Sequence, residues 1–172
     1  VNFFNQFNLT IFKAERITTH GGSIRVYLKN KRVKIEKSVK NLLKEEETFG
    51  IKKFQTYKNF AEKVYEIKSN VIKNLNKLKK DKKKIVGYGS PAKATTALNF
   101  FGVTDQIDYI IEDNKLKHGK FIPGVKIPIY SKNKVKDKIP SILVLAWNFF
   151  EDIKKNNSNI SNNFINIKDI EK

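Results

Sequence analysis

Residues 84–93 read KIVGYGSPAK, and this stretch decides the fold. The apolar run at its start is typical of a short buried strand, and two glycines follow where the chain must turn. Pro91 suits the first turn of a helix that we expect to reach Phe101 and to end at Gly102. Because a glycine-rich turn before a helix lets backbone N–H groups approach an anion, the stretch also predicts a ligand site. A tight turn that merely needs glycine is the alternative.

Further strand patterns follow on the C-terminal side. They cover residues 107–111, 125–129, 141–146 and 163–167. Pro128 indicates an edge strand, because proline cannot donate a ladder hydrogen bond, and residues 148–156 have helical character. This succession of strands and helices predicts an α/β fold with a Rossmann-like, mostly parallel sheet flanked by helices.

Two other patterns precede the parallel sheet. Residues 9–12 and 23–28 are rich in β-branched and aromatic side chains and predict two antiparallel strands. Residues 34–80 carry apolar side chains at three- and four-residue spacing, which predicts a long charged helical segment with a stop at Gly50. We therefore divide the chain into a strand pair (1–33), a helical connector that packs on the C-terminal domain (34–80) and a Rossmann-like domain (81–172).

Candidate binding residues gather at the ends of the first two strands of the parallel sheet. The first group offers backbone donors, a helix cap and a cation, and comprises Gly87, Tyr88, Gly89, Ser90 and Lys93. The second group lies near the place where doubly wound folds hold a ribose hydroxyl with an acidic residue, and comprises Glu112, Asp113, Asn114 and Lys117. Ordinary strand termination and solvated lysines are the plainer interpretation of the second group.

Two further residues are candidates on position alone. His20 lies beside Gly21 and Gly22, where an imidazole can act as acid or base near neutral pH or can be a plain loop residue. Trp147 follows the strand at 141–146 and either packs against a base or covers the sheet edge. With no cysteine and two histidines far apart in the sequence, no metal site is predicted in this chain.

Composition limits the classes of partner. The chain has 172 residues with 35 Lys+Arg against 17 Asp+Glu, a formal net charge of +18 that raises nucleic acid as a ligand. Only Arg16, Arg25 and Arg32 are arginine, which argues against a nucleic-acid reader. No apolar run is long enough to span a bilayer, so we expect no membrane association and a cytoplasmic location. Because the chain begins at Val1 and lacks methionine, we also expect a piece of a larger enzyme.

Four motifs, in this order, resemble one family. They are residues 19–27 (THGGSIRVY), 87–93 (GYGSPAK), 113–124 (DNKLKHGKFIPG) and 145–148 (LAWN). The chain resembles the C-terminal part of the S-adenosylmethionine-dependent sugar C-methyltransferases, which act on nucleotide-linked deoxy-keto sugars. Two positions depart from the family pattern, since Ser90 stands where alanine is usual and His118 where glutamine is usual.

The resemblance implies a division of labour within a larger polypeptide. The family has an N-terminal cysteine-rich zinc module, a central methyltransferase domain and a Rossmann-like C-terminal domain. Residues 1–33 would then be a remnant of the methyltransferase sheet, with S-adenosylmethionine and zinc bound outside this chain. The general base would also lie upstream, with an assisting role for His20, and the fragment alone would be inactive. The implied partners are a nucleotide-diphosphate sugar, bound by the two groups of candidate residues, and the missing domains.

Two rival interpretations stay open at this point. A Rossmann-like sheet with a glycine-rich turn is also typical of an NAD(P)-dependent oxidoreductase fragment, which would bind a dinucleotide at the same turn. The net charge of +18 leaves a basic nucleic-acid-binding module as the non-enzymatic alternative.

Overall fold

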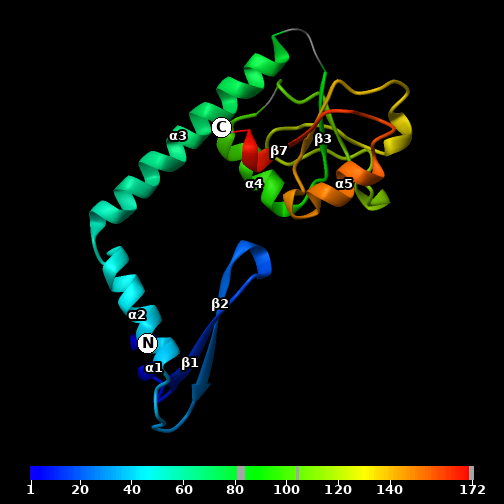
Figure 1. Cartoon of the computed structure of the whole chain (residues 1–172). Coiled ribbons are helices and arrows are strands. Elements are labelled where there is room, and N and C mark those ends of the chain that lie inside the picture. The colour runs from blue at the N-terminus through cyan, green and yellow to red at the C-terminus, as the bar shows by residue number, and fades with distance from the viewer. Residues whose placement is uncertain (81–83, 104, 171–172) are drawn as a thin grey trace. The chain divides into compact units, whose positions relative to one another are not determined.

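The computed structural model describes residues 1–80, 84–103 and 105–170 (Figure 1). The chain divides into two compact units, Val1–Ala61 and Glu62–Lys172. None of the described helices is long and apolar enough to cross a membrane.

The first unit is built on a two-stranded antiparallel sheet. A short helix, α1 (Asn2–Asn5), precedes β1 (Thr10–Ile17), and the 3-10 turn η1 (Thr19–Gly21) leads to β2 (Ser23–Lys29). The predicted strand pair is confirmed, although β1 continues beyond residue 12 to Ile17.

Helix α2 (Lys37–Phe49) packs on this sheet through a small core. Val39 of the helix is buried against Ile11 and Ala14 of β1. The helix ends at Gly50, whose φ of 81° is the left-handed conformation that glycine adopts without steric cost. The stop predicted at this glycine is confirmed.

Helix α3 (Phe54–Lys79) is one uninterrupted helix of 26 residues, because its sequence contains neither glycine nor proline. Val71 and Leu75, in its C-terminal half, are 2% and 1% exposed and belong to the core of the second unit. The apolar stripe predicted from the sequence therefore packs on the Rossmann-like sheet in this half of the helix.

The second unit contains a five-stranded sheet in which every pairing is parallel. Its strands, in the spatial order β5-β4-β3-β6-β7, are β5 (Ile129–Tyr130), β4 (Tyr109–Ile111), β3 (Ile85–Tyr88), β6 (Ser141–Val144) and β7 (Phe164–Asn166). The chain starts in the centre at β3, moves outward to β5, and returns to the other side of β3 at β6. This is the doubly wound order, so the predicted α/β, Rossmann-like fold is confirmed.

The edge strand β5 is shorter than its predicted range. Residues 125–128 lie outside it, and Pro128 instead forms an isolated antiparallel bridge with Phe121. Since proline has no N–H to donate to a ladder, β5 begins only after it.

The two faces of the sheet carry separate cores. On one face, Ala94 and Leu98 of α4 (Ala92–Phe101) pack with the α3 residues against Ile110 and Leu143. On the other face, α5 (Phe150–Asn156) packs through Phe150 and Ile153 on a core that includes Val86. Successive strand residues therefore enter opposite cores, and both faces are covered, as in other parallel sheets. The connections also contain the 3-10 helices η2 (Lys115–Lys117), η3 (Lys132–Lys134), η4 (Trp147–Phe149) and η5 (Ile167–Asp169).

Candidate functional site

The carboxyl ends of β3 and β6 meet at the point where the strand order reverses. Gly89, just after β3, has φ 84°, and a Cβ added to it would lie 2.7 Å from the Cβ of Ala146. Its N–H donates to the carbonyl of Ile111 at 2.8 Å, which holds the turn against the end of β4. Crevices at such reversals are where open α/β sheets bind ligands, so this edge is the candidate site.

Gly87 lies inside β3 rather than in the turn. It is paired with Ile110 on one side and Leu143 on the other. An added Cβ would lie 2.8 Å from Cγ1 of Ile110, closer than packed atoms approach, and 3.1 Å from Cδ1 of Leu145, closer than most packed atoms approach. Close packing above the strand therefore accounts for this glycine without a ligand.

The Glu112 carboxylate links the glycine turn to the end of β4. One of its oxygens accepts the N–H of Ser90 at 2.8 Å and the Ser90 hydroxyl at 2.5 Å, and the other accepts the N–H of Asn114 at 3.1 Å. The Lys117 ammonium lies 3.4 Å from the same carboxylate and donates to the Ser90 carbonyl at 2.9 Å. These four residues, Ser90, Glu112, Asn114 and Lys117, form what we call the Glu112 cluster.

The environment of Glu112 keeps it ionised. Burial alone would raise its pKa, but the hydrogen bonds from the Ser90 hydroxyl and the two backbone N–H groups, with the charge of Lys117, bring the pKa below its ordinary value. The cluster therefore carries a carboxylate with one nearby cation at neutral pH.

The cap expected from Ser90 is not formed. Pro91 takes the position before the first turn of α4, no side chain caps that turn, and the Ser90 hydroxyl donates to Glu112 instead. A charged acceptor makes the stronger hydrogen bond, and Glu112 comes within reach only through the β3–β4 pairing.

The imidazole of His118 contacts the backbone of Glu112 at the end of β4. Its Nε2 lies 2.6 Å from the carbonyl oxygen of Glu112. Because a carbonyl only accepts, Nε2 carries the proton in this contact. Asn114 accepts the N–H of Leu116 through its side-chain oxygen at 3.0 Å and so caps η2.

Tyr88 and Asp113 form a separate contact beside the Glu112 cluster. The Tyr88 hydroxyl lies 2.9 Å from one carboxylate oxygen of Asp113 and 3.4 Å from the side-chain oxygen of Asn157. Burial, followed by the hydrogen bond to Asp113, raises the pKa of Tyr88 to about 12. Together with Lys132 and other residues, these three line a polar cavity of about 350 Å³.

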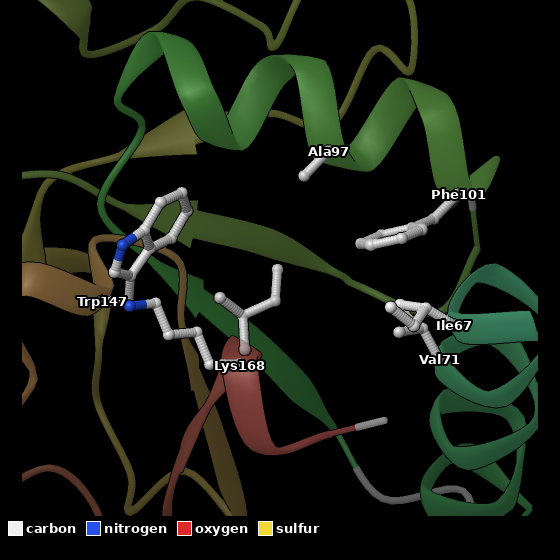
Figure 2. A pocket seen from close by; sticks show the side chains of 7 residues that line it. Ile67, Val71, Ala97, Phe101, Trp147 and Lys168 are labelled. Atoms are coloured by element: carbon white, nitrogen blue, oxygen red, sulfur yellow. The ribbon is translucent and has the colours of Figure 1, made fainter. Parts of the chain in front are cut away.

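Trp147 and Lys93 lie on the face of the sheet that α3 and α4 cover. The ammonium groups of Lys93 and Lys168 lie 5.5 Å and 5.6 Å from the centre of the indole ring, within the range of a cation–π contact. Trp147 also lines an apolar cavity of about 230 Å³. Figure 2 shows Ala97 and Phe101 of α4 along this cavity, with Trp147 and Lys168 across from Ile67 and Val71 of α3.

Comparison with known proteins shows the family to which the chain belongs. Residues 18–166 match the family described as the C-methyltransferase C-terminal domain. The chain belongs to this family. The C-methyltransferase NovU of Streptomyces niveus is 29% identical over 157 residues, which cover 89% of this chain and 37% of NovU. The chain thus spans little more than a third of that relative, and the predicted resemblance to the C-terminal part of a C-methyltransferase is confirmed.

In this C-methyltransferase C-terminal domain the predicted residues separate into several places. The Glu112 cluster brings together Ser90, Glu112, Asn114 and Lys117. Tyr88 contacts Asp113, and Lys93 lies beside Trp147. Gly87 allows close packing on β3, and Gly89 allows close packing in the turn after it. His20 lies in η1 of the first unit, and its side chain is outside the described part of the structure.

Two neighbours of the predicted residues were missed. Asn157 and Lys168 lie 69 and 21 residues along the chain from Tyr88 and Trp147, and no local pattern marks either one. Among the described residues, no group of three histidine, aspartate or glutamate side chains is placed to hold a metal ion.

Proposed function

We propose that this chain is the substrate-binding domain of an S-adenosylmethionine-dependent C-methyltransferase that acts on a nucleotide-linked deoxy-keto sugar. The observation that carries the proposal is the set of polar side chains at the carboxyl ends of β3 and β4, next to the strand-order reversal between β3 and β6, in a domain from the C-methyltransferase family. The four sequence motifs that resemble sugar C-methyltransferases supply the substrate class.

The side chains at this edge suit a ligand with both hydroxyl and phosphate groups. The carboxylate of Asp113, on an exposed residue, accepts hydrogen bonds of the kind that sugar hydroxyls donate. Lys93, beside Trp147, supplies positive charge for a diphosphate, whereas the ammonium of Lys117 is engaged by the Ser90 carbonyl and by Glu112. Binding a nucleotide sugar here would position the sugar and leave the chemistry to groups elsewhere in the enzyme.

Methyl transfer itself is assigned to the rest of the enzyme in this proposal. A base would remove a proton next to the ketone, and the enolate carbon would attack the sulfonium methyl group. S-adenosylmethionine would supply that methyl group from a domain outside this chain, and zinc would belong to a separate cysteine-rich module. A cytoplasmic location belongs to the same proposal. The role of His20 stays limited to assistance near the sugar.

Calorimetric titration of the 172-residue chain with a thymidine-diphosphate deoxy sugar tests the proposal. We expect saturable binding, weakened about tenfold by Lys93→Ala and by Asp113→Ala, each of which removes a charged contact. Lys84→Ala is the matched control, because Lys84 is an exposed lysine that precedes β3, at the opposite end of that strand. Trp147, the single tryptophan, gives an independent readout through its emission.

Two outcomes of this titration would contradict the proposal. Equal affinity of the two site variants and the wild type would remove the site assignment. Tighter binding of NADH than of the sugar nucleotide would favour an oxidoreductase fragment. Binding of DNA or RNA with a log binding constant that falls linearly with the log of the salt concentration would favour a nucleic-acid-binding module.

A further inference from the structure

We infer that Glu112 is a specificity-determining residue that closes the glycine turn to phosphate. In dinucleotide-binding sheets the phosphate rests on backbone N–H groups between the first strand and its helix. Here the equivalent turn lies between β3 and α4, and a carboxylate of the chain itself occupies the donors. The inference goes beyond the proposed function, because it holds for whichever ligand this edge binds.

The geometry of the occupied turn supports this inference. The backbone N–H and the hydroxyl of Ser90 both donate to the same oxygen of Glu112, at 2.8 Å and 2.5 Å. The N–H of the preceding Gly89 donates to the carbonyl of Ile111 at 2.8 Å. A phosphate entering this turn would therefore meet two N–H groups that already have acceptors.

Displacing the carboxylate is opposed by its other contacts. The second oxygen of Glu112 accepts the N–H of Asn114 at 3.1 Å, and only 13% of the side chain is exposed. Lys117, the neighbouring cation, donates to the Ser90 carbonyl at 2.9 Å and so ties the loop after β4 to the turn. These residues satisfy one another's hydrogen bonds, so displacing the Glu112 carboxylate would break several hydrogen bonds at once.

The negative charge of Glu112 also disfavours a phosphate in the turn. Because its hydrogen bonds and Lys117 hold the pKa of Glu112 below the ordinary value, the side chain is negative at neutral pH. A phosphate next to it would place two like charges within a few ångströms in a partly buried site, where their repulsion is screened less than in water. The phosphates of any ligand at this edge therefore lie away from Ser90, on the side of exposed cations such as Lys93.

Inorganic pyrophosphate is the probe that tests this inference. The amide signal of Ser90 in ¹H–¹⁵N spectra of the whole chain reports occupancy of the turn. In the wild type we expect no movement of this signal at millimolar pyrophosphate. In Glu112→Ala we expect a saturable shift and an affinity at least tenfold higher, because the donors are freed and the negative charge is gone.

Two further variants make the result decisive. Glu151→Ala removes an exposed carboxylate from the first turn of α5 and is expected to leave the Ser90 signal unresponsive, as in the wild type. Glu112→Gln keeps the shape and removes the charge, so a gain of a few fold is expected even where Glu112→Ala fails to fold. A wild-type Ser90 signal that titrates with the affinity of the Glu112 variants would overturn the inference. Failure of the sugar nucleotide to bind the wild type would count only against the proposed function.

Discussion

The hydroxyl of Tyr88 donates a hydrogen bond to the carboxylate of Asp113 across 2.9 Å. This contact joins the last residue of β3 to the second residue after β4, one strand away in the sheet. The adjacent Glu112 reaches instead to Ser90. Two neighbouring carboxylates thus fix two different parts of the edge, and each gives a separate prediction.

The first prediction concerns the ionisation of Tyr88. Its pKa of about 12 lies above the ordinary value of 10.0, so the folded protein holds this proton more tightly than the unfolded chain does. The stabilisation is fully present below pH 10 and is lost as the pH rises towards 12. Spectrophotometric titration of the wild type should show a late tyrosine that is missing in Tyr88→Phe. A Tyr88→Phe curve that superimposes on the wild type would contradict this assignment.

The second prediction concerns acid stability. The pKa of Glu112 is lowered in the folded state from an ordinary value of 4.5, so its stabilisation is present above pH 4.5 and is lost as the pH falls through the folded value. We expect Glu112→Gln to lower the free energy of unfolding by about 1–2 kcal/mol at pH 7 and to flatten its dependence on pH below 4.5. Urea denaturation at a series of pH values measures both. Parallel pH profiles for the two proteins would show that Glu112 does not contribute.

The third prediction separates strain from crowding at the turn. Gly89→Ala places a methyl group 2.7 Å from Ala146 and also forces alanine to φ 84°, so we expect a loss of about 2–4 kcal/mol. Gly102→Ala meets only the conformational cost, since its φ is 73° and nothing lies within 4 Å, and should lose about 1–2 kcal/mol.

A double variant tests the crowding part directly. Adding Ala146→Gly to Gly89→Ala removes the close contact and should recover part of the loss in thermal unfolding. No recovery would mean that backbone strain alone sets the cost at Gly89.

The fourth prediction tests whether α3 belongs to the core of the second unit. Leu75 is 1% exposed, and Leu75→Ala should lower the free energy of unfolding by about 2–5 kcal/mol. Leu116→Ala is the matched control in the same unit, because Leu116 is 78% exposed, and should change it by less than about 0.5 kcal/mol. Chemical denaturation compares the two, and equal losses would contradict the burial of Leu75.

The sequence predicted the positions of the strands and helices better than it predicted which strands lie next to one another in the sheet. Apolar, β-branched runs identify β3 and β6 because both faces of these strands are buried. The placement of β6 beside β3 leaves no local trace, since Ile85 and Ser141 are paired across 56 residues of chain. The general class of fold was therefore predictable from pattern, while the strand order had to come from the structure.

The candidate site shows the same limit at the level of single contacts. A serine just before a helix is typically a cap, and nothing near Ser90 in the sequence indicates a competing acceptor. The acceptor is Glu112, 22 residues away, which the β3–β4 pairing brings to the turn. Long-range pairing decides which of two ordinary hydrogen bonds a side chain makes.

Gly87, inside β3, and Gly89, in the turn after it, bear on how glycine motifs are interpreted. Gly87 makes room for Ile110 and Leu145, and Gly89 makes room for Ala146. Packing favours glycine at both positions whether or not a ligand binds. A glycine pair at the end of a strand is thus explained here by close packing, and a search that counts such a pair as a nucleotide signature will also collect domains that bind no nucleotide.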